Sequence, residues 1–411
     1  MARKRVIYQS ESLFVAPTGD WVGHATAAVP ALGGSAGSPT VPGSGVQVHR
    51  VQSINYGFDI PRQDVNEFGK LARIDQVILE SPTVSLDFTY YPETGVNERS
   101  LGLVLSPVGA SSAAGQVSAL SGMLNGNTDV KSYFIRTVSE GSDEILKGAA
   151  DASDESSIIA IGNASITSYS FEASVGGFPT ASVNAEGLNI NILAAPGDID
   201  ATGNKAATVS TESGENTDDE FCLETSTTGM TGSSFTGNQL TAAIPSALRP
   251  GDLTFTDKLE AVAGSDGELL KAWDVSELKI QSVSASLDLG REDLMKLGSK
   301  FAFSKEVQYP VTVSMSIEAS ASDMKDFDLA DLIDSDAAVY TAGFKIANPN
   351  SADSPKKQAV AVYIKGAKLD SEALSSSIGD NKSVTFNFTA QVGGPQDTTA
   401  GLFIQGGAAD D

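Results

Sequence analysis

Residues 51–88 read VQSINYGFDIPRQDVNEFGKLARIDQVILESPTVSLDF, and residues 280–317 read IQSVSASLDLGREDLMKLGSKFAFSKEVQYPVTVSMSI. The two stretches align without a gap at a constant offset of 229, and apolar residues recur at matching places. A period this long predicts two copies of a whole domain, because solenoid repeats recur every 20–50 residues or so. The identical pairs are Gln52/Gln281, Ser53/Ser282, Asp59/Asp288, Arg62/Arg291, Asp64/Asp293, Gly69/Gly298, Thr83/Thr312, Val84/Val313 and Ser85/Ser314.

A second pair of stretches extends the repeat. Residues 164–187 align with 367–390 at an offset of 203, so the first copy carries 26 extra residues. We expect the extra residues in loops near 90–116 and 138–157, and a further Ala-, Gly- and Pro-rich loop at 25–46. The predicted organisation is a first β domain at 1–195, a linker or decorating segment at 196–245, and a second β domain at 246–411.

Both copies alternate apolar and polar residues with a period of two. Val84, Leu86, Phe88 and Tyr90 are separated by polar residues, and residues 384–392 show the same pattern. This periodicity predicts half-buried antiparallel strands, with one face on a core and a wet face of Ser, Thr and Asn.

Each copy also offers one short helix. The apolar residues that indicate it in the second copy fall within 323–338, and a weaker set occurs in the first copy. We therefore expect a mainly β (α+β) fold of two tandem β-sandwich or barrel domains of similar fold, each with one short flanking helix. The first-copy residues are Val117, Leu120, Met123 and Leu124, and the second-copy residues are Met324, Phe327, Leu329, Leu332 and Ile333.

The formal net charge of −25 limits the possible partners. Such a chain repels phosphate backbones and anionic membranes, although solubility alone explains acidity equally well. One cysteine, Cys222, excludes an intramolecular disulfide, and no apolar run is long enough for a transmembrane helix. We expect folding in a cytoplasm and no membrane association.

Residues suited to catalysis are scarce. The two histidines, His24 and His49, and the single cysteine cannot form a Cys/His zinc site, and they leave few options for a catalytic triad. His49 stands at a predicted strand start and is expected to be structural. The Gly-x-Ser-x-Gly pattern at 33–37 lacks a flanking strand and helix, and the calcium-loop-like stretch from Asp198 has Val209 where a glutamate is needed. We therefore expect no enzyme, no cofactor and no metal.

The strongest local signal is a doubled motif of Arg, Asp and two apolar residues before a glycine. It suits a connector that forms one helical turn. In this turn the Asp side chain caps the N-terminus, the two apolar side chains pack inward, and the Gly ends the turn in a left-handed conformation. It suits equally a connector whose following loop, 70–82 or 299–311, reaches a neighbouring domain or subunit. The two interpretations are compatible. The motif residues are Arg62, Asp64, Val65, Phe68 and Gly69 in the first copy and Arg291, Asp293, Leu294, Leu297 and Gly298 in the second.

The order of strand, motif, long loop and strand, followed by a helix and a strand pair around 174–176 and 377–379, resembles the tail tube proteins of long-tailed bacteriophages. The resemblance covers roughly 51–192 and 278–395. It implies β domains whose sheets join between subunits into a ring-wide β-barrel, with rings stacked into a hollow tube. The duplication resembles members that form trimeric, pseudo-hexameric rings, whereas single-domain members form hexamers.

The resemblance implies a structural virion protein, made in the host bacterial cytoplasm and located in the tail. Its expected partners are other copies of itself, the tape-measure protein, and tail terminator or baseplate proteins. The resemblance also implies that DNA passes through the tube without specific binding. The alternatives are another phage tail or capsid component, a surface β-protein or adhesin, and an acidic glycosidase with a carboxylate pair. The 26-residue expansion and the segment from 194 to 245 depart from the family pattern and leave the simple ring packing open.

Overall fold

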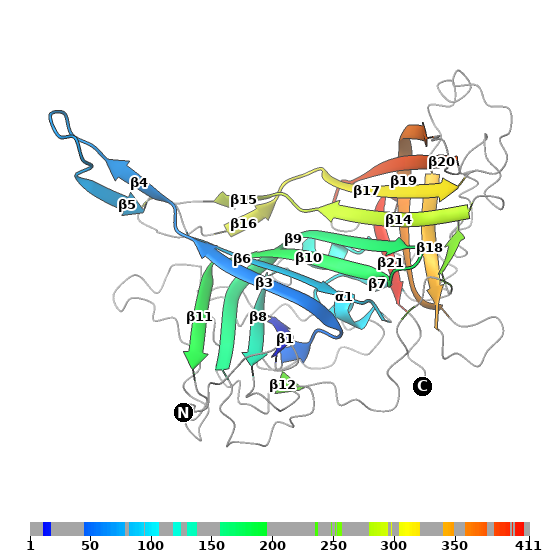
Figure 1. Ribbon diagram of the computed structural model, residues 1–411, viewed down its shortest axis with the longest axis horizontal. Coiled ribbons are helices and arrows are strands. Elements are labelled where there is room, and N and C mark those ends of the chain that lie inside the picture. Colours follow the sequence, from blue (N-terminus) through cyan, green and yellow to red (C-terminus); the bar gives the residue numbers. More distant parts are fainter. Residues whose placement is uncertain are drawn as a thin grey trace.

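In the computed structural model the described part of the chain consists mostly of β-strands, and most of their pairings are antiparallel (Figure 1). The residues that it describes are 11–17, 45–78, 82–93, 95–106, 118–124, 130–137, 157–194, 235–236, 248, 251, 253–256, 279–294, 297, 304–320, 340–348, 358–375, 382–394, 397 and 399–406. The mainly β class expected from the sequence is confirmed.

Eight strands form the main sheet, and all neighbours in it are antiparallel. Their spatial order is β3 (Val51–Asp59), β6 (Thr83–Tyr90), β10 (Thr180–Gly187), β9 (Ser157–Ser174), β14 (Lys279–Asp288), β17 (Val311–Ser320), β20 (Ser383–Val392) and β19 (Gln358–Ser375). The first four strands come from the first copy and the last four from the second. A single sheet therefore runs through both copies.

The two long strands, β9 and β19, also belong to a second layer. The first part of β9 pairs with β8 (Val130–Thr137) and β11 (Asn189–Ala194), and β8 pairs with β1 (Glu11–Pro17). The first part of β19 pairs with β18 (Tyr340–Ala347) and β21 (Gly401–Gly406). In Figure 1 these strands cross the main sheet at its two ends. Short strands complete the layer: β2 (Gly45–Gln47), β7 (Leu105–Ser106), β12 (Phe235–Thr236) and β13 (Leu253–Thr256).

The core lies between the main sheet and the second layer. The burial of β6 and β20 alternates along each strand, as the period of two predicted, because successive side chains point to opposite faces. Aromatic rings link the layers: Phe88 of β6 lies 6.0 Å from Tyr133 of β8, and Phe171 of β9 lies 4.9 Å from Phe344 of β18. Ring pairs at these separations are favourable beyond their buried area.

The helices of the described part differ from those expected from the sequence. The first copy contains α1 (Val96–Ser100) and α2 (Ser121–Leu124), so the expectation of one helix is wrong there, and a loop expected at 90–116 includes α1 and β7. Leu120 and Met123 are buried as predicted. Residues 323–338 lie outside the described part of the chain, as do most of 25–46, 138–157 and 196–245. The domain boundaries at 195 and 246 stay predictions.

Two β-hairpins extend from the main sheet and form separate two-stranded sheets. The first consists of β4 (Arg62–Val65) and β5 (Asp75–Ile78), and it projects far beyond the body of the molecule (Figure 1). The second consists of β15 (Arg291–Leu294) and β16 (Ser304–Val307), and it lies beside β9 and β10 in the same view.

Candidate self-assembly interface

The two copies meet where β9 pairs with β14 in the middle of the main sheet. Seven residue pairs form this joint, from Ser282 opposite Ser174 to Asp288 opposite Ser168. On its apolar side Ala285 faces Phe171 and Leu287 faces Tyr169, and all four side chains are buried. The joint therefore carries both a hydrogen-bonded ladder and a packed face.

Hydrogen bonds close both ends of this joint. The Leu289 N–H donates to the Thr167 carbonyl at 2.7 Å, and the Val175 N–H donates to the Gln281 carbonyl at 2.9 Å. The side chain of Arg291 also crosses from the second copy to the first, where its Nε donates to the Ile166 carbonyl at 3.3 Å. Arg291 is a residue of the doubled motif, so one motif member serves contact between the copies.

The corresponding strands at the two ends of the main sheet have an open side. Among the described strands, β3 pairs only with β6, and residues 368–375 of β19 pair only with β20. The offset of 229 makes β3 the counterpart of β14, and the offset of 203 makes β19 the counterpart of β9. The open side of β3 therefore corresponds to the side of β14 that pairs with β9, and the open side of β19 corresponds to the side of β9 that pairs with β14.

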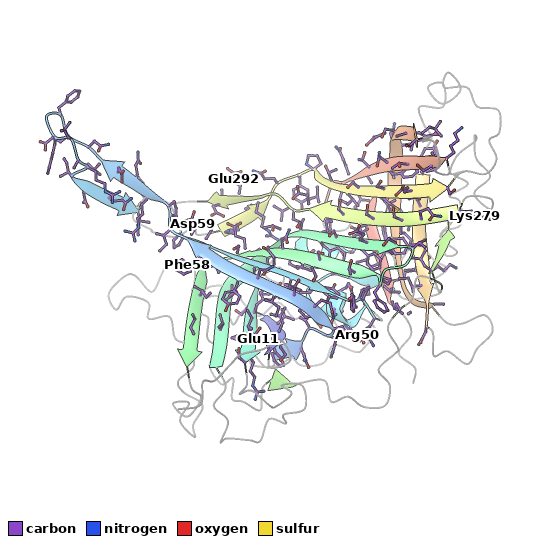
Figure 2. The ribbon with its side chains drawn as sticks, in the orientation of Figure 1. Glu11, Arg50, Phe58, Asp59, Lys279 and Glu292 are labelled. Atoms are coloured by element: carbon purple, nitrogen blue, oxygen red, sulfur yellow. The ribbon has the colours of Figure 1, made fainter. Side chains whose placement is uncertain are left out.

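Burial differs sharply between the occupied and the open sides. Tyr56 and Phe58 on β3 are 44% and 65% exposed, whereas their counterparts Ala285 and Leu287 are each 1% exposed. At the other end Leu374 is 50% exposed, whereas its counterpart Phe171 is 1% exposed. Figure 2 shows Phe58 at the free margin of the sheet, where the projecting hairpin begins. Large apolar side chains are thus left in water where the internal joint would bury them.

The helical turn predicted for the doubled motif is not formed in either copy. Arg62 to Val65 and Arg291 to Leu294 are strands of hairpins, and they form no helical turn. The apolar pair does not pack, because Val65 is 42% and Phe68 is 107% exposed. Only the left-handed glycine is confirmed, at Gly69 with φ +90°. Leu297 is fully exposed like its counterpart Phe68, and Gly298 lies outside the described residues.

The motif aspartates form ion pairs within the hairpins. Asp64 lies 3.0 Å from Arg73, in a pair whose side chains are about half exposed. Asp293 lies 3.4 Å from Lys305, whose ammonium group also lies 3.4 Å from Glu186 on β10. Lys305 lies on β16, within the stretch 299–311 that was expected to be a loop, and this stretch therefore reaches the first copy.

Both copies contain the same β-bulge and the same Asn–Ser side-chain hydrogen bond, and the sequence analysis predicted neither. A bulge at Gln52 in β3 recurs at Gln281 in β14, and each glutamine side chain donates to the carbonyl two residues before it. Asn184 donates to Ser168 at 2.7 Å, and Asn387 donates to Ser371 at 2.9 Å. The identical residues were visible in the alignment and were the available signal. Bulges of this kind bend a strand and fix its register.

The face of the main sheet away from the core is hydroxyl-rich, as predicted. Hydroxyl pairs cross it, such as Ser286 with Ser314 at 2.6 Å and Ser53 with Thr89 at 2.7 Å. The register of the strands also places several carboxylates on this face. They are Asp59, Asp87, Glu172, Glu186, Asp288 and Glu318.

No protein-family model matches the chain, and no curated protein is similar to it in sequence. In the described part of the chain no cluster of three or more His, Cys, Asp or Glu residues is arranged to hold a metal ion. None of the helices in that part is long and apolar enough to cross a membrane.

Proposed function

We propose that this chain is a structural subunit that assembles head to tail with copies of itself through the open sides of β3 and β19. The observation that carries the proposal is the burial difference between these strands and their counterparts. Phe58 is largely exposed at the edge, and Leu287 is buried at the same place in the internal joint. Pairing the two edges between chains removes exposed strand edges, which otherwise promote uncontrolled aggregation.

A closed ring is the expected product of such pairing. The contact is heterologous, because β3 of one chain meets β19 of the next, and heterologous contacts form rings when the rotation closes. Each chain supplies two similar four-stranded units, so three chains give a ring with pseudo-sixfold symmetry. A hexamer of chains is the alternative stoichiometry.

The two faces of the sheet decide which side lines the ring. The second layer covers the apolar face, where Phe88 contacts Tyr133 and Phe171 contacts Phe344. The hydroxyl-rich face then points to the central hole. Carboxylates such as Asp87 and Glu172 lie on it, and their charge opposes adhesion of DNA to the wall.

The function that fits best is the major tail tube subunit of a long-tailed bacteriophage, whose stacked rings form a conduit for DNA ejection. The projecting hairpin β4–β5 offers an exposed apolar tip, at Phe68 and Leu71, for contact with the next ring. The tape-measure protein and the tail terminator or baseplate proteins are the further proposed partners. Its proposed location is the virion tail.

Electron microscopy of the purified chain tests this function. Threefold or sixfold rings, or hollow tubes, would support it. Isolated particles that bind glycans would support a surface adhesin, and particles that decorate a capsid or join a tail only at its end would support another virion component.

A further inference from the structure

The internal β9–β14 joint points to the residue register of the contact between chains. We infer that β3 of one chain pairs with β19 of the next so that Asn55 lies opposite Ser375, Gly57 opposite Ala373 and Asp59 opposite Ser371. This inference rests on the assembly proposed above. It goes further by naming the register and the residue that clamps it.

The register follows from two structural correspondences. In the internal joint Ser284 lies opposite Glu172 and Ser286 opposite Ser170. The shared bulge at Gln52 and Gln281 fixes the offset of 229 for β3. The shared bulges at the start of the paired segments of β9 and β19, with the Asn184–Ser168 and Asn387–Ser371 hydrogen bonds, fix the offset of 203.

The side chains on the apolar face are complementary in size at this register. In the internal joint small Ala285 faces large Phe171, whereas the inferred joint places large Tyr56 opposite smaller Leu374. Similarly, Leu287 faces Tyr169 inside the chain, and Phe58 would face Glu372 between chains. At both positions the side chain on β3 is larger than its counterpart on β14, and the side chain on β19 is smaller than its counterpart on β9. Close packing requires such compensation.

Arg62 is the residue that would clamp the joint. Its counterpart Arg291 donates from Nε to the Ile166 carbonyl, and the counterpart of Ile166 is Leu369. Arg62 is exposed within its own chain. The inferred contact is therefore a hydrogen bond from Arg62 to the Leu369 carbonyl of the next chain, which assigns the first motif arginine a role between subunits.

Disulfide trapping tests the register. In antiparallel sheets a non-hydrogen-bonded pair brings Cα atoms within disulfide range, whereas diagonal neighbours lie near its limit or beyond it. Asn55 and Ser375 form such a pair at the inferred register, since the main-chain groups of Asn55 face β6. In a Cys222→Ser background, the variant Asn55→Cys/Ser375→Cys should cross-link into dimers and higher oligomers on oxidation. The control Asn55→Cys/Ala373→Cys, shifted by two residues on the same face, should lose this product.

The possible results separate the register from the function. If the native chain assembles but the shifted pair cross-links as well as the matched pair, the register is overturned and the proposed assembly stands. If the native chain stays monomeric, the proposed function itself is contradicted. Arg62→Met should lower the cross-linking yield of the matched pair, whereas Arg73→Met, in the exposed hairpin pair with Asp64, should leave it unchanged. Equal yields would overturn the clamp.

Discussion

Lys305 Nζ lies 3.4 Å from Glu186 Oε2, so the hairpin of the second copy is tied to a strand of the first. The Lys305 side chain is 5% exposed and also contacts Asp293, whereas the two carboxylates are about one-third exposed. Lys305→Met would leave two carboxylates near each other without their cation. We expect a loss of about 1–2 kcal/mol in the free energy of unfolding, discounted for the partial exposure of the carboxylates.

Urea denaturation of the monomeric chain measures this loss. The control Glu186→Gln keeps the Lys305–Asp293 pair and should cost less. A Lys305→Met variant as stable as the native chain would show that the hairpin is held by other contacts.

The repeat supplies a matched pair of arginine variants. Arg291→Lys removes the planar donor that reaches the Ile166 carbonyl and should destabilise the monomer by about 1–2 kcal/mol. Arg62→Lys, at the same motif position on the open edge, should change monomer stability by less than about 0.5 kcal/mol. Equal effects in chemical denaturation would contradict a special role for the occupied joint.

Buried Glu98 should make stability depend on pH. Its carboxylate accepts from the Tyr90 hydroxyl at 2.9 Å and the Tyr169 hydroxyl at 3.4 Å. Burial raises the pKa of Glu98 above its ordinary value of 4.5, while the two tyrosine hydroxyls lower it in part. Because the folded-state pKa lies above the unfolded one, the unfolded state binds fewer protons. Stability from this group therefore falls as the pH rises from about 4.5 through the raised pKa.

Glu98→Gln removes the cost of burying the charge and keeps an acceptor for the tyrosines. The stability of the native chain minus that of Glu98→Gln should decrease as the pH rises from about 4.5 toward 7. Thermal or urea unfolding of both proteins over this range measures the difference. A difference that is constant with pH would mean that Glu98 has the same pKa in both states.

We expect the projecting hairpin β4–β5 to contribute to the stacking of rings into tubes and not to the stability of the folded chain. Phe68 and Leu71 at its tip are fully exposed, so Phe68→Ser/Leu71→Ser should leave the unfolding free energy within about 0.5 kcal/mol of the native value. The same variant should form rings but shorter tubes in electron micrographs. The control Asn66→Ser alters a neighbouring exposed polar residue and should have no effect. Tubes of native length in the double variant would contradict contact between rings through this tip.

Assembly should increase with salt. Subunits with a formal net charge of −25 repel one another as they approach. The screening length falls from about 30 Å at 0.01 M ionic strength to about 3 Å at 1 M, so the repulsion weakens. Light scattering at a fixed protein concentration should therefore rise with sodium chloride. A signal that stays unchanged over this range would count against charge-limited association.

The sequence predicted the strands well, because their signal is local. The alternation of Val84, Leu86 and Phe88 shows in β6 as alternating burial. The hairpin at 62–78 was misread for a physical reason. Val65 and Phe68 are three residues apart before the left-handed Gly69, a spacing that also suits one turn of helix. Among the described residues, Phe68 is fully exposed and Val65 is 42% exposed, so the two do not form a packed turn.

The alternation of apolar and polar residues predicts a strand, but it does not predict which strands pair with it. Ile54, Tyr56 and Phe58 alternate as in a half-buried strand. Tyr56 and Phe58 are nevertheless exposed, because no described strand pairs with the side of β3 opposite β6. The position of β14 against β9 likewise depends on where the chain returns after 194–245. The open sides of β3 and β19 become visible only in the structure, where the equivalent strands β14 and β9 pair with each other.

The mass of the particles formed by the native chain and by Phe58→Pro tests the central claim most directly. The Leu289 N–H points across the internal joint, so its counterpart Ile60 and the alternate residue Phe58 direct their N–H groups away from β6. Proline at 58 removes a donor from the open edge and spares the β6 ladder. Phe58→Leu, which copies Leu287, is the matched control.

Light scattering coupled to size exclusion should give a multiple of 42.5 kDa for the native chain and for Phe58→Leu, and 42.5 kDa for Phe58→Pro. A native mass of 42.5 kDa at every concentration and salt, or a Phe58→Pro variant that assembles as readily as the native chain, would contradict assembly through this edge.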